Sequence, residues 1–91
     1  MDFSDQGILV LATMEMARRR GASSFCPSEV VRWIYPQDWR HFMEEEKEAM
    51  MWLFKRGFLE IRQGGDLIAE NFLPEGPVRL NIKPKTDAGF T

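Results

Sequence analysis

The amino-acid sequence predicts a single α+β domain, because three stretches with helical spacing of apolar residues are followed by two with alternating spacing. The change of period occurs at Gly57, after which the apolar residues Leu59 and Ile61 alternate with charged side chains. A chain of 91 residues is long enough for one modest hydrophobic core and too short for two. We therefore expect one domain over residues 1–83 and a frayed tail over residues 84–91.

The first predicted helix is capped by Ser4 or Asp5 and ends at Arg20, since Gly21 is a typical helix stop. The arginines in its last turn are placed where the helix dipole favours cations. Its apolar residues form two neighbouring stripes, which together are wider than a small core requires. One stripe holds Phe3, Val10, Leu11, Met14 and Ala17, and the other holds Ile8, Leu9, Ala12 and Met16.

The second predicted helix begins at Pro27, because proline suits the first helical position, and it ends before Pro36. The small residues 22–25 precede it and can form a brief strand. We expect its buried face to consist of Val30, Val31, Trp33 and Ile34.

A third helix is predicted over residues 43–56, after a tight turn or single helical turn over residues 37–41. We expect Trp39 to be mostly buried as the apolar anchor of that turn, wedged between the second and third helices. The core face of the third helix is expected to hold Ala49, Met50, Leu53 and Phe54, and its start carries Glu44, Glu45 and Glu46.

The alternating stretches predict that residues 58–63 pair antiparallel with residues 77–82. Residues 64–76 are too many for a tight hairpin and are expected to form a wing loop, with some extra pairing at residues 67–69. The order of helix, brief strand, helix, helix and hairpin is that of a winged helix-turn-helix.

Three motifs stand at the joints of these elements: C-P-S-E-V at residues 26–30, D-W-R at 38–40 and G-P-V-R-L at 76–80. Together with Gly57, and with Gln63 and Gly65, they resemble a bacterial domain-of-unknown-function family, number 3253, regarded as winged-helix-like. The resemblance implies that fold and no established activity, so it transfers no catalytic residues. Such domains commonly carry a basic residue in the third helix, where this chain has acidic residues.

The composition points to a protein of the cytoplasm, with no membrane segment. A single cysteine suits a reducing compartment, and the acidic residues 1–5 do not resemble a secretory signal. The net charge of −2 argues mildly against a dedicated nucleic-acid binder.

No set of residues in the sequence indicates an enzyme, a metal site or a cofactor site. Cys26 and His41 are the only cysteine and histidine, and a cysteine with a histidine is the minimal set for nucleophilic catalysis, but nothing in the sequence places the two together. We expect Cys26 to be an inert, half-buried residue at the helix start. Ser28 and Glu29 are expected to complete the cap of that helix, although the same exposed amides could bind an anion.

Two basic groups are candidates for phosphate contacts: Arg62, Arg79 and Lys83 on the outward side of the two strands, and Arg18, Arg19 and Arg20 at the end of the first helix. The alternative for the strand arginines is cross-strand pairing with Glu60 and Glu75. Trp39 and Arg40 form a possible stacking and phosphate-binding pair; the alternative is that Arg40 pairs with a nearby glutamate.

A partner surface is the other candidate, because apolar residues remain outside the core stripes. We assign to it Ile8, Leu9, Met16, Met51 and Trp52. Two functions are therefore expected: a module that binds DNA weakly and in a salt-dependent way through its wing, or a protein-interaction or dimerisation module that contacts its partner through the first helix.

Overall fold

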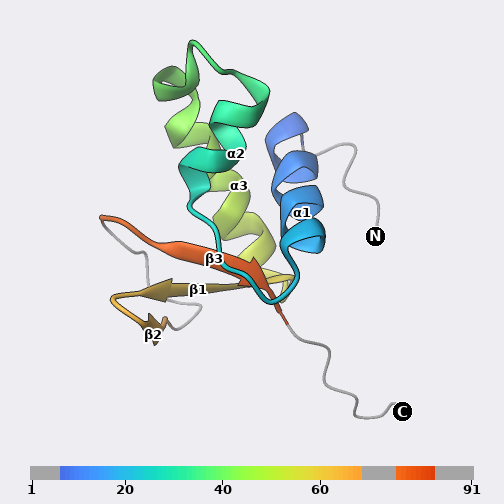
Figure 1. Ribbon diagram of the computed structural model, residues 1–91, viewed down its shortest axis with the longest axis vertical. Coiled ribbons are helices and arrows are strands. Elements are labelled where there is room, and N and C mark those ends of the chain that lie inside the picture. Colours follow the sequence, from blue (N-terminus) through green and yellow to red (C-terminus); the bar gives the residue numbers. More distant parts are fainter. Residues whose placement is uncertain (1–6, 69–75, 84–91) are drawn as a thin grey trace.

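The computed structural model describes residues 7–68 and 76–83, which form an α+β fold. In this part of the chain three α-helices are followed by a three-stranded antiparallel sheet. Figure 1 shows the helices gathered on one side of the sheet. The elements are α1 (Ile8–Arg20), α2 (Pro27–Ile34), the 3₁₀ helix η2 (Trp39–Phe42), α3 (Met43–Lys55), β1 (Leu59–Gln63), β2 (Asp66–Leu67) and β3 (Arg79–Ile82). The predicted fold class and the order of its elements are confirmed.

The predicted helix ends are confirmed except at the start of α1 and at the end of α3, which stops at Lys55, one residue before the predicted end. Gly57, with φ of 84°, lets the Phe58 amide donate to the Leu53 carbonyl at 3.0 Å, which closes the last turn of α3. The first helix begins at Ile8, because Gly7 has φ of 100° and is not helical. Several sequence expectations fall outside the described residues: the caps Ser4 and Asp5, Phe3, Ala69, Glu75 and the tail over 84–91.

The sheet has the order β2-β1-β3, and the predicted antiparallel pairing of β1 with β3 is confirmed. The chain turns from β1 into β2 through Gly64 and Gly65, whose φ values of 61° and 90° suit a two-residue hairpin. The predicted extra pairing is therefore present at Leu67, which faces Arg62. The predicted brief strand before α2 is reduced to one bridge, in which Phe25 and Leu80 exchange backbone hydrogen bonds of 2.8 and 2.7 Å.

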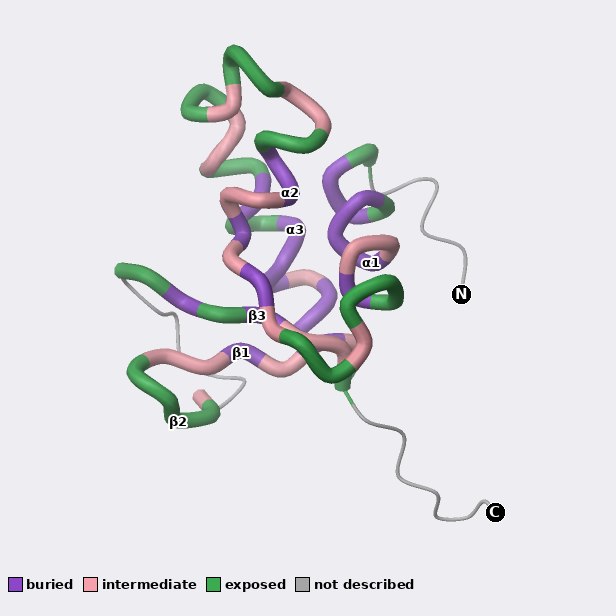
Figure 2. Tube along the Cα trace, viewed as in Figure 1, coloured by how far each residue is buried: buried purple, intermediate pink, exposed green. Residues whose placement is uncertain are grey.

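The core lies where the three helices meet the inner face of the sheet (Figure 2). The four core residues predicted for α3 are all buried, and so are Val30 and Val31. Trp33, which is predicted on the buried face of the second helix, is 45% exposed instead, and Leu11 is 42% exposed. The buried side of α1 therefore takes residues from both predicted stripes, including Leu9 but not Leu11.

One buried contact between α1 and α3 is polar. Thr13 and Glu46 are both fully buried, and the Thr13 hydroxyl oxygen lies 2.8 and 3.0 Å from the two carboxyl oxygens of Glu46. Glu46 shares the core face of α3 with Met50 and Leu53, since these positions are one turn apart. Glu46 is therefore part of the core, unlike its exposed neighbours Glu44 and Glu45.

Candidate nucleic-acid interface

The three predicted wing cations lie along the strands as expected. Arg62 and Arg79 face each other directly in the register of β1 and β3, and Lys83 follows β3 with the parity of Arg79. Directly opposed like charges normally destabilise a strand pair. Internal contacts offset this repulsion, since the guanidinium of Arg62 lies 3.7 Å from Glu60 and that of Arg79 turns toward α2.

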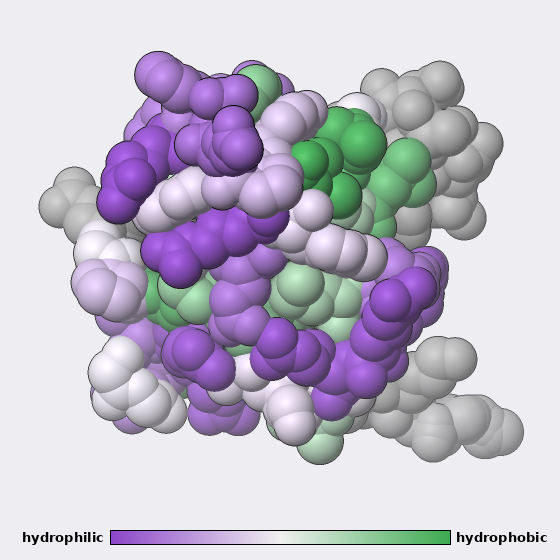
Figure 3. Space-filling view, turned by 45° about the horizontal axis from the view of Figure 1, so that its top comes forward, coloured by the Kyte–Doolittle hydropathy of each residue, from purple (hydrophilic) through white to green (hydrophobic). Residues whose placement is uncertain are grey.

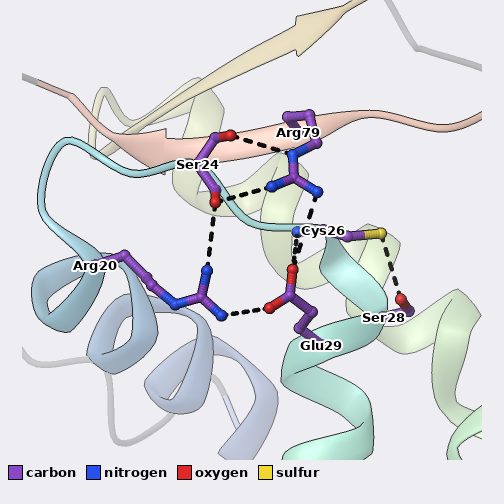
Figure 4. A network of polar contacts seen from close by, with 6 residues as sticks. All are labelled: Arg20, Ser24, Cys26, Ser28, Glu29 and Arg79. Atoms are coloured by element: carbon purple, nitrogen blue, oxygen red, sulfur yellow. Dashed lines mark hydrogen bonds and ion pairs between the residues drawn. The ribbon is translucent and has the colours of Figure 1, made fainter.

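Glu29 is the centre of a polar network that joins α1, α2 and β3 (Figure 4). Its carboxylate accepts a hydrogen bond of 2.9 Å from the Cys26 amide, which caps α2 as predicted. The same carboxylate forms an ion pair with Arg20 and lies 4.0 Å from the Arg79 guanidinium. Both arginines also donate to the Ser24 carbonyl, at 3.4 Å from Arg20 and 3.0 Å from Arg79.

These contacts lower the pKa of Glu29 below its ordinary value. The hydrogen bond from the Cys26 amide contributes most; partial burial opposes it, and Arg20 and Arg79 add to the lowering. Glu29 is therefore ionised at neutral pH. The structure thus links the C-P-S-E-V motif, which holds Glu29, to the G-P-V-R-L motif, which holds Arg79, and this link gives both motifs a structural role.

The remaining predicted cations are exposed, and their ion pairs are at the surface. Arg18 and Arg19 lie 3.8 and 2.9 Å from Glu15, one turn earlier in α1. Lys83 forms no ion pair within residues 7–68 and 76–83. The alternative of cross-strand pairing for Arg62 is not observed with Glu60, because Glu60 is two residues away on the same strand.

The start of α3 presents negative charge to solvent. Glu44 and Glu45 are exposed, and Glu44 lies 3.7 Å from Lys47, while Glu46 is buried against Thr13. Two exposed carboxylates thus stand at the leading end of the helix that a winged helix would place in a DNA groove.

Trp39 is partly buried, as expected, but it is not among the described residues that pack against the core, so the predicted position between the second and third helices is not observed. The guanidinium carbons of Arg32 and Arg40 lie 4.1 and 4.4 Å from the centroid of its ring. Arg40 therefore stacks on Trp39, and forms no ion pair with a described glutamate. Helical spacing in the sequence gives no sign of this stack, because Trp39 and Arg40 lie in the 3₁₀ helix η2 rather than in an α-helix.

The predicted partner surface is only partly at the surface. Leu9 and Met51 are buried, at 5% and 8% exposure, so their assignment to it is wrong. Both belong to the buried core cluster, since the core face of each helix is broader than one stripe. Met16 and Trp52 are half-buried, and Ile8 is 52% exposed.

Cys26 is half-buried, and its sulfur accepts a hydrogen bond of 3.3 Å from the Ser28 hydroxyl. It precedes α2, whereas His41 lies in η2, beyond the other end of that helix. The structure therefore does not bring His41 next to Cys26.

The comparisons with known proteins place the chain in a family without assigning it an activity. A search of curated proteins gives no match, and none of the helices in the described ranges is long and apolar enough to cross a lipid bilayer. One family model, described as a protein of unknown function (DUF3253), matches residues 8–83. Because this match covers most of the chain, including every helix and strand described above, the protein belongs to the DUF3253 family.

Proposed function

We propose that this protein is a winged-helix module that binds nucleic acid weakly, through cations at the end of α1 and along the outer side of β1 and β3. The observation that carries the proposal is the meeting of the two predicted basic groups. Arg20 from α1 and Arg79 from β3 both donate to the Ser24 carbonyl, so the two groups form one surface. Their separation in sequence gave no sign of this.

The charge balance of that surface differs from the balance of the whole chain. The net charge of the protein is −2, yet among the residues that the structure describes the six cations have only Glu15, Glu29 and Glu60 as ion-pair partners. Exposed ion pairs of this kind contribute little to stability, so phosphate groups can compete for Arg18, Arg19 and Arg62. Phosphate binding would release counterions, and affinity would fall steeply with salt.

The acidic start of α3 favours binding without sequence selection. Glu44 and Glu45 would repel the phosphates that border a major groove, so α3 is poorly suited to read base edges. A domain with this charge pattern would hold the backbone of DNA and show little preference among duplex sequences.

A titration of fluorescently labelled duplex DNA at low and moderate salt tests the proposal. The double variant Arg62→Ala/Lys83→Ala should weaken binding and reduce its salt dependence, because Lys83 is exposed, Arg62 is partly exposed, and both lie outside the Glu29 network. Lys55→Ala is the control, since Lys55 is an exposed cation at the end of α3. Glu44→Lys/Glu45→Lys should strengthen binding.

Two outcomes contradict the proposal. If neither the parent protein nor any variant binds duplex DNA at low salt, the basic surface does not bind nucleic acid. If the parent binds tightly, with sequence preference and tolerance to salt, α3 reads bases despite its charge.

An apolar surface on α1 favours a second candidate, self-association. Ile8 and Leu11 are exposed, and Figure 3 shows a hydrophobic patch where α1 begins. Beside it lies a hollow of about 220 Å³ between α1 and α3, lined in part by Ala49 and Trp52. A second copy of the chain is the occupant we propose, and Leu11→Ser should then lower the mass measured by sedimentation equilibrium at high protein concentration. A monomer at every concentration would exclude dimerisation.

A further inference from the structure

Two tryptophans lie outside the hydrophobic core that the described residues form. Trp33 of α2 and Trp39 of η2 are absent both from the buried cluster and from the partly buried residues packed against it. Their rings lie against arginines instead, with the Arg19 guanidinium 5.5 Å from the Trp33 centroid and those of Arg32 and Arg40 close to Trp39. We name these five residues the Arg–Trp surface.

The charge of the Arg–Trp surface is largely uncompensated. Within the described ranges, Arg32 and Arg40 have no carboxylate within 4.0 Å, and Arg19 has only Glu15. A guanidinium that covers a ring uses its flat face and leaves its in-plane N–H groups available to acceptors. Arg32 and Arg40 can therefore bind anionic oxygens while Trp39 holds their orientation.

The surface continues into the basic surface described above. Arg19 precedes Arg20 in the last turn of α1, and a hollow of about 330 Å³ lies beside Trp33, lined also by Met16, Arg20 and Glu29. An aromatic ring at the edge of a hollow, among arginines, is an arrangement that suits a flat and negatively charged ligand.

We propose that the Arg–Trp surface binds single-stranded nucleic acid, with an unpaired base stacked on Trp33 and backbone phosphates held by Arg32 and Arg40. In a duplex the faces of each base are covered by its neighbours, so only an unpaired base can stack on an exposed indole. The proposal rests on the nucleic-acid binding proposed above and specifies the strand form and a second set of contacts.

The test compares a labelled oligothymidine with a labelled duplex at low salt. Trp33→Ala and the double variant Arg32→Gln/Arg40→Gln should each weaken single-strand binding about tenfold, the usual scale for loss of one stacked base or two phosphate contacts. Both should leave duplex binding unchanged. The fluorescence of tryptophan should be quenched by oligothymidine in the parent and less so in Trp33→Ala.

Arg56→Ala is the matched control, because Arg56 also stacks on a tryptophan: its guanidinium lies 3.9 Å from the Trp52 centroid on α3. It should leave single-strand binding unchanged. The glutamine variants keep the test independent of any contribution that Trp33 makes to folding, since Arg32 and Arg40 are exposed.

Loss of single-strand binding in both sets of variants, with duplex binding retained, supports the inference. Unchanged affinity for the single strand in both sets of variants overturns the inference. The proposed function is tested separately, by the effect of Arg62→Ala/Lys83→Ala on duplex binding. A parent protein that binds neither oligothymidine nor duplex overturns both proposals.

Discussion

Glu29 and Glu46 are both placed near the start of a helix, in α2 and in α3, yet their surroundings are opposite. Glu29 is half-buried and accepts a backbone hydrogen bond beside two arginines, and its pKa is lowered. Glu46 is fully buried, with Thr13 as its hydrogen-bond partner, and burial raises its pKa to about 8. The partners of a carboxyl group, rather than its place in a helix, thus decide whether it is charged.

The hydrogen bonds around Thr13 independently indicate that Glu46 is protonated. The Thr13 hydroxyl oxygen lies 2.6 Å from the Leu9 carbonyl oxygen and 2.8 Å from a carboxyl oxygen of Glu46. One hydroxyl carries one hydrogen, which the Leu9 carbonyl accepts. A protonated Glu46 supplies the second hydrogen by donating to Thr13, whereas a carboxylate would leave two acceptors competing for one.

The largest expected effect is a fall in stability as pH rises, caused by Glu46. Its folded pKa is about 8 and its unfolded value is 4.5, so its contribution to stability is complete below pH 4.5 and is lost as pH rises toward 8. The free energy of unfolding should fall by up to roughly 1.4 kcal/mol for each pH unit in that window. Urea unfolding at several pH values measures this slope.

Glu46→Gln should remove most of that slope and be more stable than the parent at about pH 8, because a neutral amide can still donate to Thr13. Glu45→Gln is the control, since Glu45 is the exposed neighbour of Glu46. If the parent and Glu46→Gln have the same pH dependence, Glu46 is ionised in the folded protein and the contrast with Glu29 disappears.

A smaller effect in the opposite direction is expected at Glu29. Its folded pKa is lowered, so its contribution to stability is present above pH 4.5 and is lost as pH falls through the lowered value. Glu29→Gln should lower the free energy of unfolding by about 1 kcal/mol at neutral pH, a modest value because the side chain is 35% exposed.

The difference between Glu29→Gln and the parent should vanish in acid, where Glu29 is protonated in both folded and unfolded states. Glu44→Gln serves as the control, because Glu44 is highly exposed and its partner Lys47 lies 3.7 Å away. A loss of stability in Glu29→Gln that persists unchanged in acid would show that packing, rather than charge, accounts for it.

The helices and strands could be predicted from local signals, because Gly21, Pro36 and Gly57 end elements through backbone geometry alone. The cap by Glu29 could be predicted for the same reason, since it involves residues three apart. The surroundings of Trp39 and Glu46 could not. They depend on the packing of one helix against another, which the hydropathy of a single residue does not report.

The positions of Glu46 and Thr13 did carry a weak signal. Glu46 has core spacing relative to Met50 and Leu53, and Thr13 has core spacing relative to Leu9 and Ala17. Two polar residues at core positions of two facing helices indicate a buried pair. The meeting of Arg20 with Arg79 had no such signal, because residues 21–78 separate them and the approach follows from the bridge between Phe25 and Leu80.

The smallest expected effect concerns Cys26, which belongs to the Glu29 network through its backbone amide rather than its thiol. Cys26→Ser should change the free energy of unfolding by less than about 1 kcal/mol, because serine is a preferred N-cap residue and can accept the Ser28 hydrogen bond. Thermal melting of the variant beside Glu29→Gln measures the difference. An inert, half-buried thiol at this position should react slowly. The side chain of Cys26 is therefore more than a structural part of the cap if Cys26→Ser is as destabilised as Glu29→Gln, or if the parent thiol is alkylated rapidly at neutral pH.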